Sequence, residues 1–176
     1  KELITSAAKK QGYEYVATGR PPSFMNQDSG LMILSKHPIV TSEFVSFSSY
    51  SWADMIVDKG FLYAKIKLHD QQNMHVVTTH MDAHASGVRE NQVKQISQYI
   101  REHLEDDLKN ELCIITGDWN IAAPSEEYSS MLQNFPDFQN IYQAVDSSFK
   151  ELSKKEKMEM VEKNLKMVNL WYHHHK

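Results

Sequence analysis

The sequence contains a single cysteine, Cys113, among 176 residues, and this excludes a framework of internal disulfide bonds. Because Cys113 lies in an apolar run, we expect it to be a small buried residue. No run approaches the roughly 18 apolar residues of a membrane-spanning helix, and no signal peptide is visible. Since the chain begins with Lys1, this absence does not locate the protein, and both a cytoplasmic and a secreted location stay open.

An excess of basic residues is also missing. Lysine and arginine number 19 against 23 aspartates and glutamates, so the net charge is -4 and the pI is about 6.1. Domains that bind duplex nucleic acid nonspecifically are usually basic. The balance therefore weighs against nucleic acid as a partner, although bound metal ions offset such a charge in some nucleases. The hydrophobic fraction of 41% is sufficient for one domain with a sizeable core.

Helical and strand patterns alternate along the chain, which predicts an α/β or mixed α+β architecture. The strand patterns cover residues 13–16, 31–35, 39–47, 61–68, 74–79 and 112–115, and the helical patterns cover residues 2–11 and 88–108, with a shorter helix after Pro124. From residue 149 the chain is rich in lysine and glutamate, with apolar residues at helical spacing. This tail has two interpretations: packing or disorder, or an amphipathic element at a membrane surface.

Asp118 and Asn120 follow an apolar run that stops at Thr116-Gly117. In an extended chain, residues two apart point the same way, so both side chains could project from the carboxyl end of a buried strand. Open α/β sheets place their ligands at such ends. A carboxylate beside an amide suits a hard cation, or the orientation of a water molecule. The alternative is an Asx-type turn after a core strand.

His80 ends a second strand pattern and is followed closely by Asp82. A histidine near a metal-bound phosphate can stabilise an oxyanion or transfer a proton. The alternative for His80 is a loop histidine that is hydrogen-bonded to the backbone. Arg89 lies at the start of the long helix that follows, where it could reach the same strand end; the alternative is a solvated first turn of that helix. Four other histidines, His37, His69, His75 and His103, are expected to be surface residues.

Five segments occur in an order and spacing similar to those of a known superfamily. They are residues 29–39, 59–66, 79–83, 88–92 and 117–121. Together they resemble the endonuclease/exonuclease/phosphatase, or deoxyribonuclease I-like, enzymes, and among these most closely the neutral sphingomyelinases. The stretch Lys-Gly-Phe-Leu-Tyr-Ala-Lys-Ile at residues 59–66 favours that branch over the nucleases.

The resemblance implies a two-sheet α/β (α+β) sandwich that hydrolyses a phosphodiester with Mg²⁺, or alternatively Mn²⁺, Co²⁺ or Ca²⁺. Asp118 would orient or deprotonate the attacking water, and Asp118 and Asn120 would hold the metal. Asn120 and Arg89 would bind the phosphate. His80 would stabilise the developing charge or protonate the leaving group. The implied substrate is sphingomyelin or a similar phospholipid at a membrane surface. A nuclease of the same fold and a non-catalytic module are the alternatives.

Two motifs of the superfamily are not found. A strand with an asparagine and a metal-binding glutamate should precede Lys1, and a Ser-Asp-His motif with a second catalytic histidine should follow near the C-terminus. We therefore expect an incomplete domain at residues 1–148 and a charged, helical or disordered tail at residues 149–176. The chain would then be either a fragment of an active enzyme or a degenerate homologue.

Overall fold

The computed structural model describes residues 1–21, 28–52, 58–68 and 72–140. The chain divides into two compact units, Lys1–Phe135 and Pro136–Lys176. All the described helices and strands belong to the first unit. The predicted tail at residues 149–176 lies outside the described residues. Within these ranges, no helix is long and apolar enough to cross a membrane.

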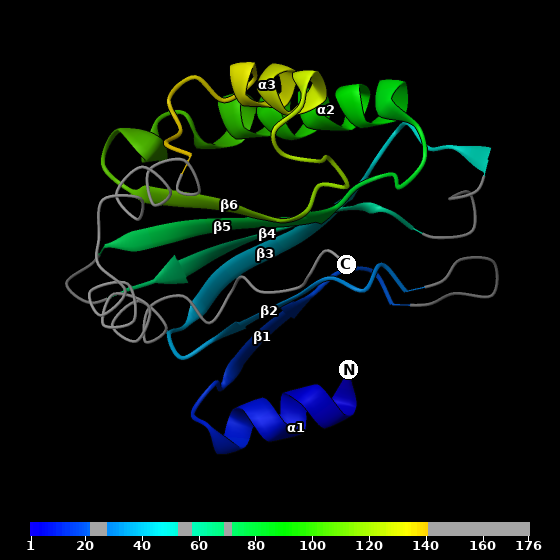
Figure 1. The fold of residues 1–176 in the computed structure, drawn as a ribbon. Coiled ribbons are helices and arrows are strands. Elements are labelled where there is room, and N and C mark those ends of the chain that lie inside the picture. The colour runs from blue at the N-terminus through cyan, green and yellow to red at the C-terminus, as the bar shows by residue number, and fades with distance from the viewer. Residues whose placement is uncertain (22–27, 53–57, 69–71, 141–176) are drawn as a thin grey trace, which may run out of the picture. The chain divides into compact units, whose positions relative to one another are not determined.

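A four-stranded sheet forms the centre of the first unit (Figure 1). Its spatial order is β3 (Ile39–Ser46), β4 (Gly60–Lys67), β5 (Asn73–His80) and β6 (Leu112–Asp118). The first three strands are antiparallel neighbours, whereas β5 and β6 run parallel. Because parallel neighbours require a crossover, helix α2 (Ser86–Leu104) lies between them in the chain.

The four strands share one end. Ser46 pairs with Gly60, Gly60 with His80, and His80 with Asp118. These four positions form a row across the sheet, which we call the His80 edge. The row contains both strand exits at which the sequence analysis placed polar functional residues, so the sheet brings the two exits together.

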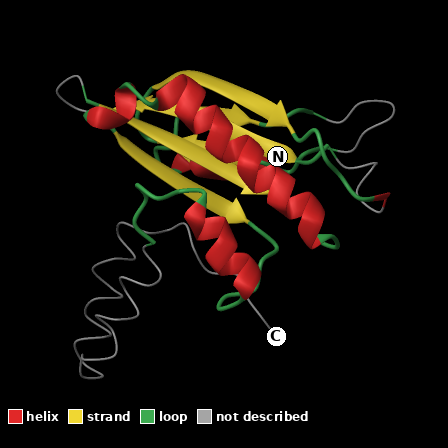
Figure 2. Ribbon diagram, turned by 90° about the horizontal axis from the view of Figure 1, so that it is seen from above, coloured by secondary structure: helices red, strands yellow, loops and turns green. Residues whose placement is uncertain are grey.

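A two-stranded antiparallel sheet of β1 (Tyr15–Thr18) and β2 (Met32–Ser35) covers one face of the large sheet. The core between them contains Ala17, Leu31, Ile33, Leu62, Ala64, Ile66 and Val76. Helices α2 and α3 (Glu126–Gln133) lie on the opposite face (Figures 1 and 2). The predicted mixed α/β architecture with two sheets is therefore confirmed.

The elements begin and end within a few residues of their predicted bounds, and the difference at β6 is informative. Strand β6 does not stop at Thr116 but continues through Asp118. Gly117 permits this because its φ is 130° and because a Cβ at this position would lie 2.2 Å from the carbonyl oxygen of Thr79. The glycine thus extends the parallel pairing to His80 and Asp118. At the N-terminus, α1 (Glu2–Lys10) ends just before Gly12, whose φ is 83°.

Candidate functional site

The side chains of His80 and Asp118 meet at the exposed end of the parallel pair. The His80 Nε2 lies 4.0 Å from the Asp118 Oδ2, and the two side chains are 41% and 64% exposed. At this separation the imidazole and the carboxylate are neighbours in front of solvent rather than a closed hydrogen-bonded pair. A molecule that approaches this edge can therefore contact both groups.

Asn120 reaches the same place by a turn, so the expectation of an extended chain from Asp118 to Asn120 is wrong. Its φ is 51°, and its backbone N–H donates to the Asp118 Oδ1 at 2.9 Å. This is the Asx-type turn that was the alternative interpretation. The Asn120 Nδ2 also donates to the carbonyl oxygen of Met81 at 2.9 Å. The amide is thereby fixed beside the residue that follows His80.

The carbonyl oxygen of Met81 accepts a second side-chain hydrogen bond. The Lys59 Nζ donates to it at 2.7 Å, and Lys59 is only 7% exposed. Lys59 immediately precedes Gly60 in the row that forms the His80 edge. Two donors from different parts of the chain therefore hold the peptide between His80 and Asp82. The sequence analysis used Lys59 only as part of a family motif and missed this positioning contact.

Asp82 is fully buried two residues after His80 and organises the loop that leads into α2. Its carboxylate accepts from the backbone N–H groups of His84 and Ala85 at 2.8 Å and from that of Ser51 at 2.9 Å. Burial alone would raise the Asp82 pKa. The hydrogen bonds from Ser51, Ala85 and His84 outweigh burial and hold this pKa well below its usual range. Asp82 is thus an ionised structural anchor.

The guanidinium of Arg89 is engaged by protein groups. Its Nε and one terminal nitrogen donate to the Glu127 carboxylate at 2.7 and 2.9 Å, and the other terminal nitrogen donates to the Asp82 carbonyl oxygen at 3.1 Å. The hydrogen bond to Glu127 raises the Arg89 pKa. This bidentate pair joins the start of α2 to α3. The direct contact between Arg89 and a phosphate stays a prediction.

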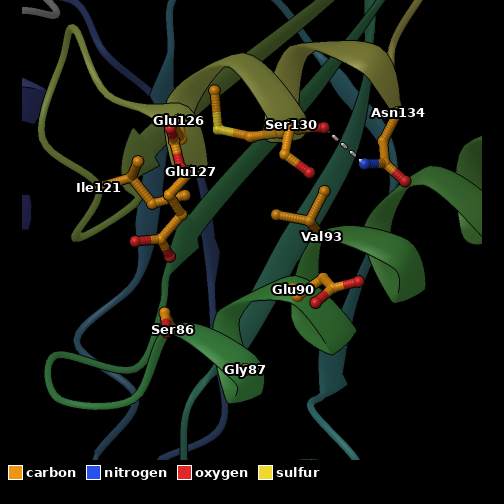
Figure 3. A pocket seen from close by; sticks show the side chains of 10 residues that line it. Ser86, Gly87, Glu90, Val93, Ile121, Glu126, Glu127, Ser130 and Asn134 are labelled. Atoms are coloured by element: carbon orange, nitrogen blue, oxygen red, sulfur yellow. Dashed lines mark hydrogen bonds between the residues drawn. The ribbon is translucent and has the colours of Figure 1, made fainter.

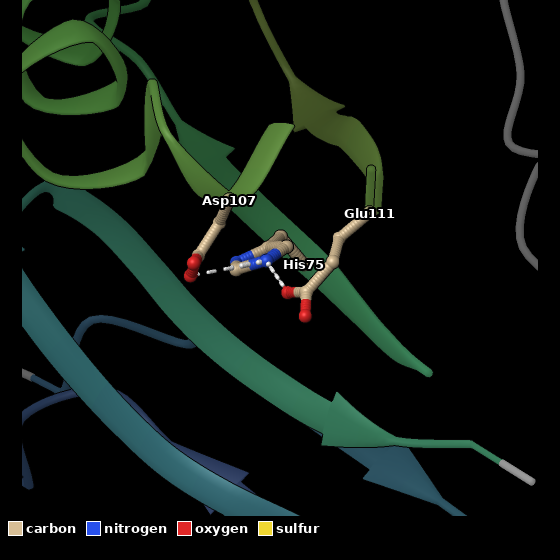
Figure 4. A group of neighbouring side chains, drawn as sticks. All are labelled: His75, Asp107 and Glu111. Carbon is tan, nitrogen blue, oxygen red and sulfur yellow. Dashed lines mark hydrogen bonds and ion pairs between the residues drawn. The ribbon is translucent and has the colours of Figure 1, made fainter. Parts of the chain in front are cut away.

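Among the described residues, two groups of side chains offer ligand atoms for a metal ion. At the His80 edge, Asp118 offers a carboxylate, and Asn120 offers its Oδ1 because its Nδ2 is already donating. The second group consists of His75, Asp107 and Glu111, whose ligand atoms lie within 4.8 Å of one another (Figure 4). His75 is five residues before His80 on β5, so the second group lies roughly 17 Å along the strand.

His75 is completely buried, so the expectation that it is a surface residue is wrong. Its Nε2 lies 2.6 Å from the Glu111 Oε2, and its Nδ1 lies 3.0 Å from the Tyr63 hydroxyl. The Lys65 ammonium is 2.7 Å from the Asp107 Oδ2 and 3.2 Å from the Glu111 Oε2. A cation already neutralises these carboxylates, so the residues form a satisfied buried network.

The charges of this network are mutually stabilised. Hydrogen bonds from Asn73, then His75 and Lys65, outweigh burial and lower the pKa of Glu111 to about 2. The hydrogen bond to Asp107 raises the pKa of Lys65. A metal ion would have to displace a well-paired ammonium group. The hard oxygen donors of Asp118 and Asn120 therefore fit Mg²⁺ better than this cluster does.

A cavity of about 310 Å³ lies between α2 and α3 (Figure 3). Its lining residues are Ser86, Gly87, Glu90, Val93, Ile121, Glu126, Glu127, Ser130, Met131 and Asn134. They do not include His80, Asp118 or Asn120. The cavity is therefore lined mainly by α2 and α3, and of the residues just after β6 only Ile121 reaches it.

Comparisons with known proteins identify relatives of similar sequence and fold. The chain is 32% identical over 140 residues to sphingomyelinase C of Bacillus cereus. This match covers 71% of this chain and 41% of that protein. The crystal structure of sphingomyelinase C from Streptomyces griseocarneus matches with a TM-score of 0.64 and 28% identity, over 76% of this chain and 51% of that one. These neighbours confirm the predicted deoxyribonuclease I-like fold class.

A third relative carries metal ions. A beta toxin variant from Staphylococcus aureus, solved with bound magnesium ions, matches with a TM-score of 0.64 and 29% identity, over 71% of this chain and 49% of that one. The chain thus spans about half the length of the relatives it matches, or less. The model of the endonuclease/exonuclease/phosphatase family matches residues 4–158. The chain therefore belongs to the endonuclease/exonuclease/phosphatase family.

Proposed function

We propose that the protein is a metal-dependent phosphodiesterase that hydrolyses sphingomyelin or a similar phospholipid, and that this chain supplies His80, Asp118 and Asn120 to its site. One observation carries the proposal. The polar side chains of two strand exits stand side by side at an exposed sheet edge, with the His80 Nε2 4.0 Å from the Asp118 Oδ2. Both side chains face solvent at this edge, so an acid and a base are available to one bound phosphodiester.

The reaction follows from the roles of these groups. Asp118 orients the attacking water and accepts its proton as the water oxygen bonds to phosphorus. The bond between phosphorus and the ceramide oxygen breaks, and His80 donates a proton to that oxygen. The products are phosphocholine and ceramide. Asn120, fixed by its bond to the Met81 carbonyl oxygen, keeps its Oδ1 available at the same exit.

Asp118 and Asn120 would hold a divalent cation through hard oxygen atoms, and Mg²⁺ is the ion we propose. Mg²⁺ commonly takes one or two protein oxygens and completes its shell with water and substrate phosphate. When bound it would polarise the phosphoryl oxygen and neutralise developing charge. Arg89 contributes indirectly in this proposal, because its bonds to Glu127 and to the Asp82 carbonyl oxygen stabilise the loop after His80.

A phospholipid is favoured over nucleic acid by two observations. The relatives that match with about 30% identity are named sphingomyelinases and phospholipases. The chain has a net charge of -4, so it also lacks the excess of basic residues that is typical of domains that bind nucleic acid.

The test is release of phosphocholine from sphingomyelin micelles by the full-length protein with Mg²⁺. His80→Ala and Asp118→Asn should each lower the rate by about 100-fold or more. Asp106→Asn is the matched control, because the Asp106 side chain is 94% exposed in the turn after α2. Activity that survives both site substitutions would overturn the assignment of the site. DNA cleavage without phosphocholine release would overturn the lipid assignment and favour a nuclease.

A further inference from the structure

Two large aromatic side chains are exposed beside the His80 edge. Trp52 is 88% exposed and Tyr50 is 56% exposed. Both lie on the connection that leaves β3 at Ser46 and rejoins the sheet at Gly60, the two positions that continue the row from His80. The aromatic pair therefore belongs to the same end of the sheet as the proposed site.

The backbone that carries these side chains is anchored. The N–H of Ser48 donates to the Gln95 Oε1 at 3.0 Å, and the Gln92 Nε2 donates to the Ser49 carbonyl oxygen at 2.8 Å. The N–H of Ser51, between the two aromatic residues, donates to the buried Asp82 carboxylate at 2.9 Å. The main chain that carries Tyr50 and Trp52 is therefore fixed, and it holds both rings at the surface.

We infer that Tyr50 and Trp52 dock the His80 edge onto the headgroup–acyl boundary of a zwitterionic phospholipid bilayer. The inference rests on the proposed function. Tryptophan and tyrosine prefer this boundary because each combines an apolar ring with a polar group that can stay hydrated. An anionic bilayer is disfavoured by the net charge of -4, since binding to anionic lipid depends on clustered lysine and arginine.

The shared anchor couples docking to the site. Asp82 holds Ser51 through one carboxylate oxygen and the backbone after His80 through the other. A membrane that receives Trp52 would therefore present its phosphodiester groups close to His80 and Asp118. The aromatic pair adds affinity for the lipid surface without contacting the reacting atoms.

The experiment measures binding of the full-length protein to vesicles of phosphatidylcholine and sphingomyelin, with EDTA present so that binding is measured without hydrolysis. Burial of only about 60 Å² of apolar ring corresponds to about a tenfold change in affinity. Trp52→Ala should therefore weaken binding about tenfold, and the double variant with Tyr50→Ala should weaken it further. Leu112→Ala is the control, because Leu112 is 59% exposed at the opposite end of the sheet and its loss should leave binding unchanged.

Two further measurements separate the possible outcomes. Indole fluorescence of the wild type should be quenched by brominated phosphatidylcholine, and Trp52→Phe should remove most of that quenching. Hydrolysis of a soluble phosphodiester, bis(4-nitrophenyl) phosphate, should be unchanged in Trp52→Ala. Vesicle binding that is equal in wild type and double variant overturns the docking inference while leaving the proposed hydrolysis intact. Absence of hydrolysis by the wild type would refute the proposed function. The docking inference would still be decided by the binding data, because those are collected without hydrolysis. Binding to a protein partner with no response to brominated lipid would also overturn the inference.

Discussion

Replacement of Asp82 by asparagine should strongly destabilise the protein, although Asp82 is not proposed to touch the substrate. The buried carboxylate accepts three backbone hydrogen bonds, from Ser51, His84 and Ala85. Hydrogen bonds to a charged group are worth about 1.5–3 kcal/mol each. Asparagine keeps one acceptor oxygen, removes the charge and turns an NH₂ group toward at least one N–H donor. We expect the free energy of unfolding to fall by about 3 kcal/mol.

Urea denaturation followed by far-ultraviolet circular dichroism measures this loss. The matched control is Asp118→Asn, because the Asp118 side chain is 64% exposed. This control should unfold within about 0.5 kcal/mol of the wild type while losing its activity. Equal unfolding free energies for wild type and Asp82→Asn would refute the role of Asp82 as a structural anchor.

The same substitution should change the acid stability of the fold. The pKa of Asp82 in the folded state is held below its unfolded value of about 3.9. Its stabilisation is therefore complete above about pH 4 and is lost as the pH falls toward the folded pKa. The unfolding free energy of the wild type should decline over this acidic range, and Asp82→Asn should decline less steeply.

Two other substitutions test the parallel strand pair and the helix start. Gly117→Ala should lower the free energy of unfolding by about 3 kcal/mol or more and abolish activity. The reason is that its Cβ would lie 2.2 Å from the Thr79 carbonyl oxygen, at a φ of 130°. A stable, active variant in denaturation and hydrolysis assays would contradict this geometry. Arg89→Lys should lose the bidentate contact and cost about 1–2 kcal/mol, with a coupling to Glu127→Gln in a double-mutant cycle. A rise in KM for Arg89→Lys that Glu127→Gln does not share would instead show direct phosphate binding by Arg89.

The meeting of His80 and Asp118 was predictable from the sequence. Two apolar strand patterns ended in polar residues, and a helical pattern of crossover length separated them. A β-helix-β unit places parallel strands side by side with their carboxyl ends together. Local periodicity therefore sufficed to find the edge and two of its side chains.

The contacts that support this edge were not predictable in the same way. Arg89 meets Glu127 across 38 positions of sequence, and Lys59 meets the Met81 carbonyl oxygen across 22. Such pairs are selected by the packing of elements in three dimensions, which a periodic pattern does not encode. His75 was misplaced for a related reason. Its burial is stabilised by Glu111 and Tyr63, partners that only the assembled sheet brings close.

The β5–α2–β6 crossover has a consequence for the order of folding. The bond between Asn120 and the Met81 carbonyl oxygen spans 39 residues and forms only when α2 has docked and β6 has paired with β5. Closing so long a loop costs entropy before any contact compensates for it, and nonlocal parallel pairing is slow. Antiparallel neighbours β4 and β5 are close in sequence and should pair first. The polar edge would then assemble last, so a nascent or partly unfolded chain would form its hydrophobic layers before its proposed site.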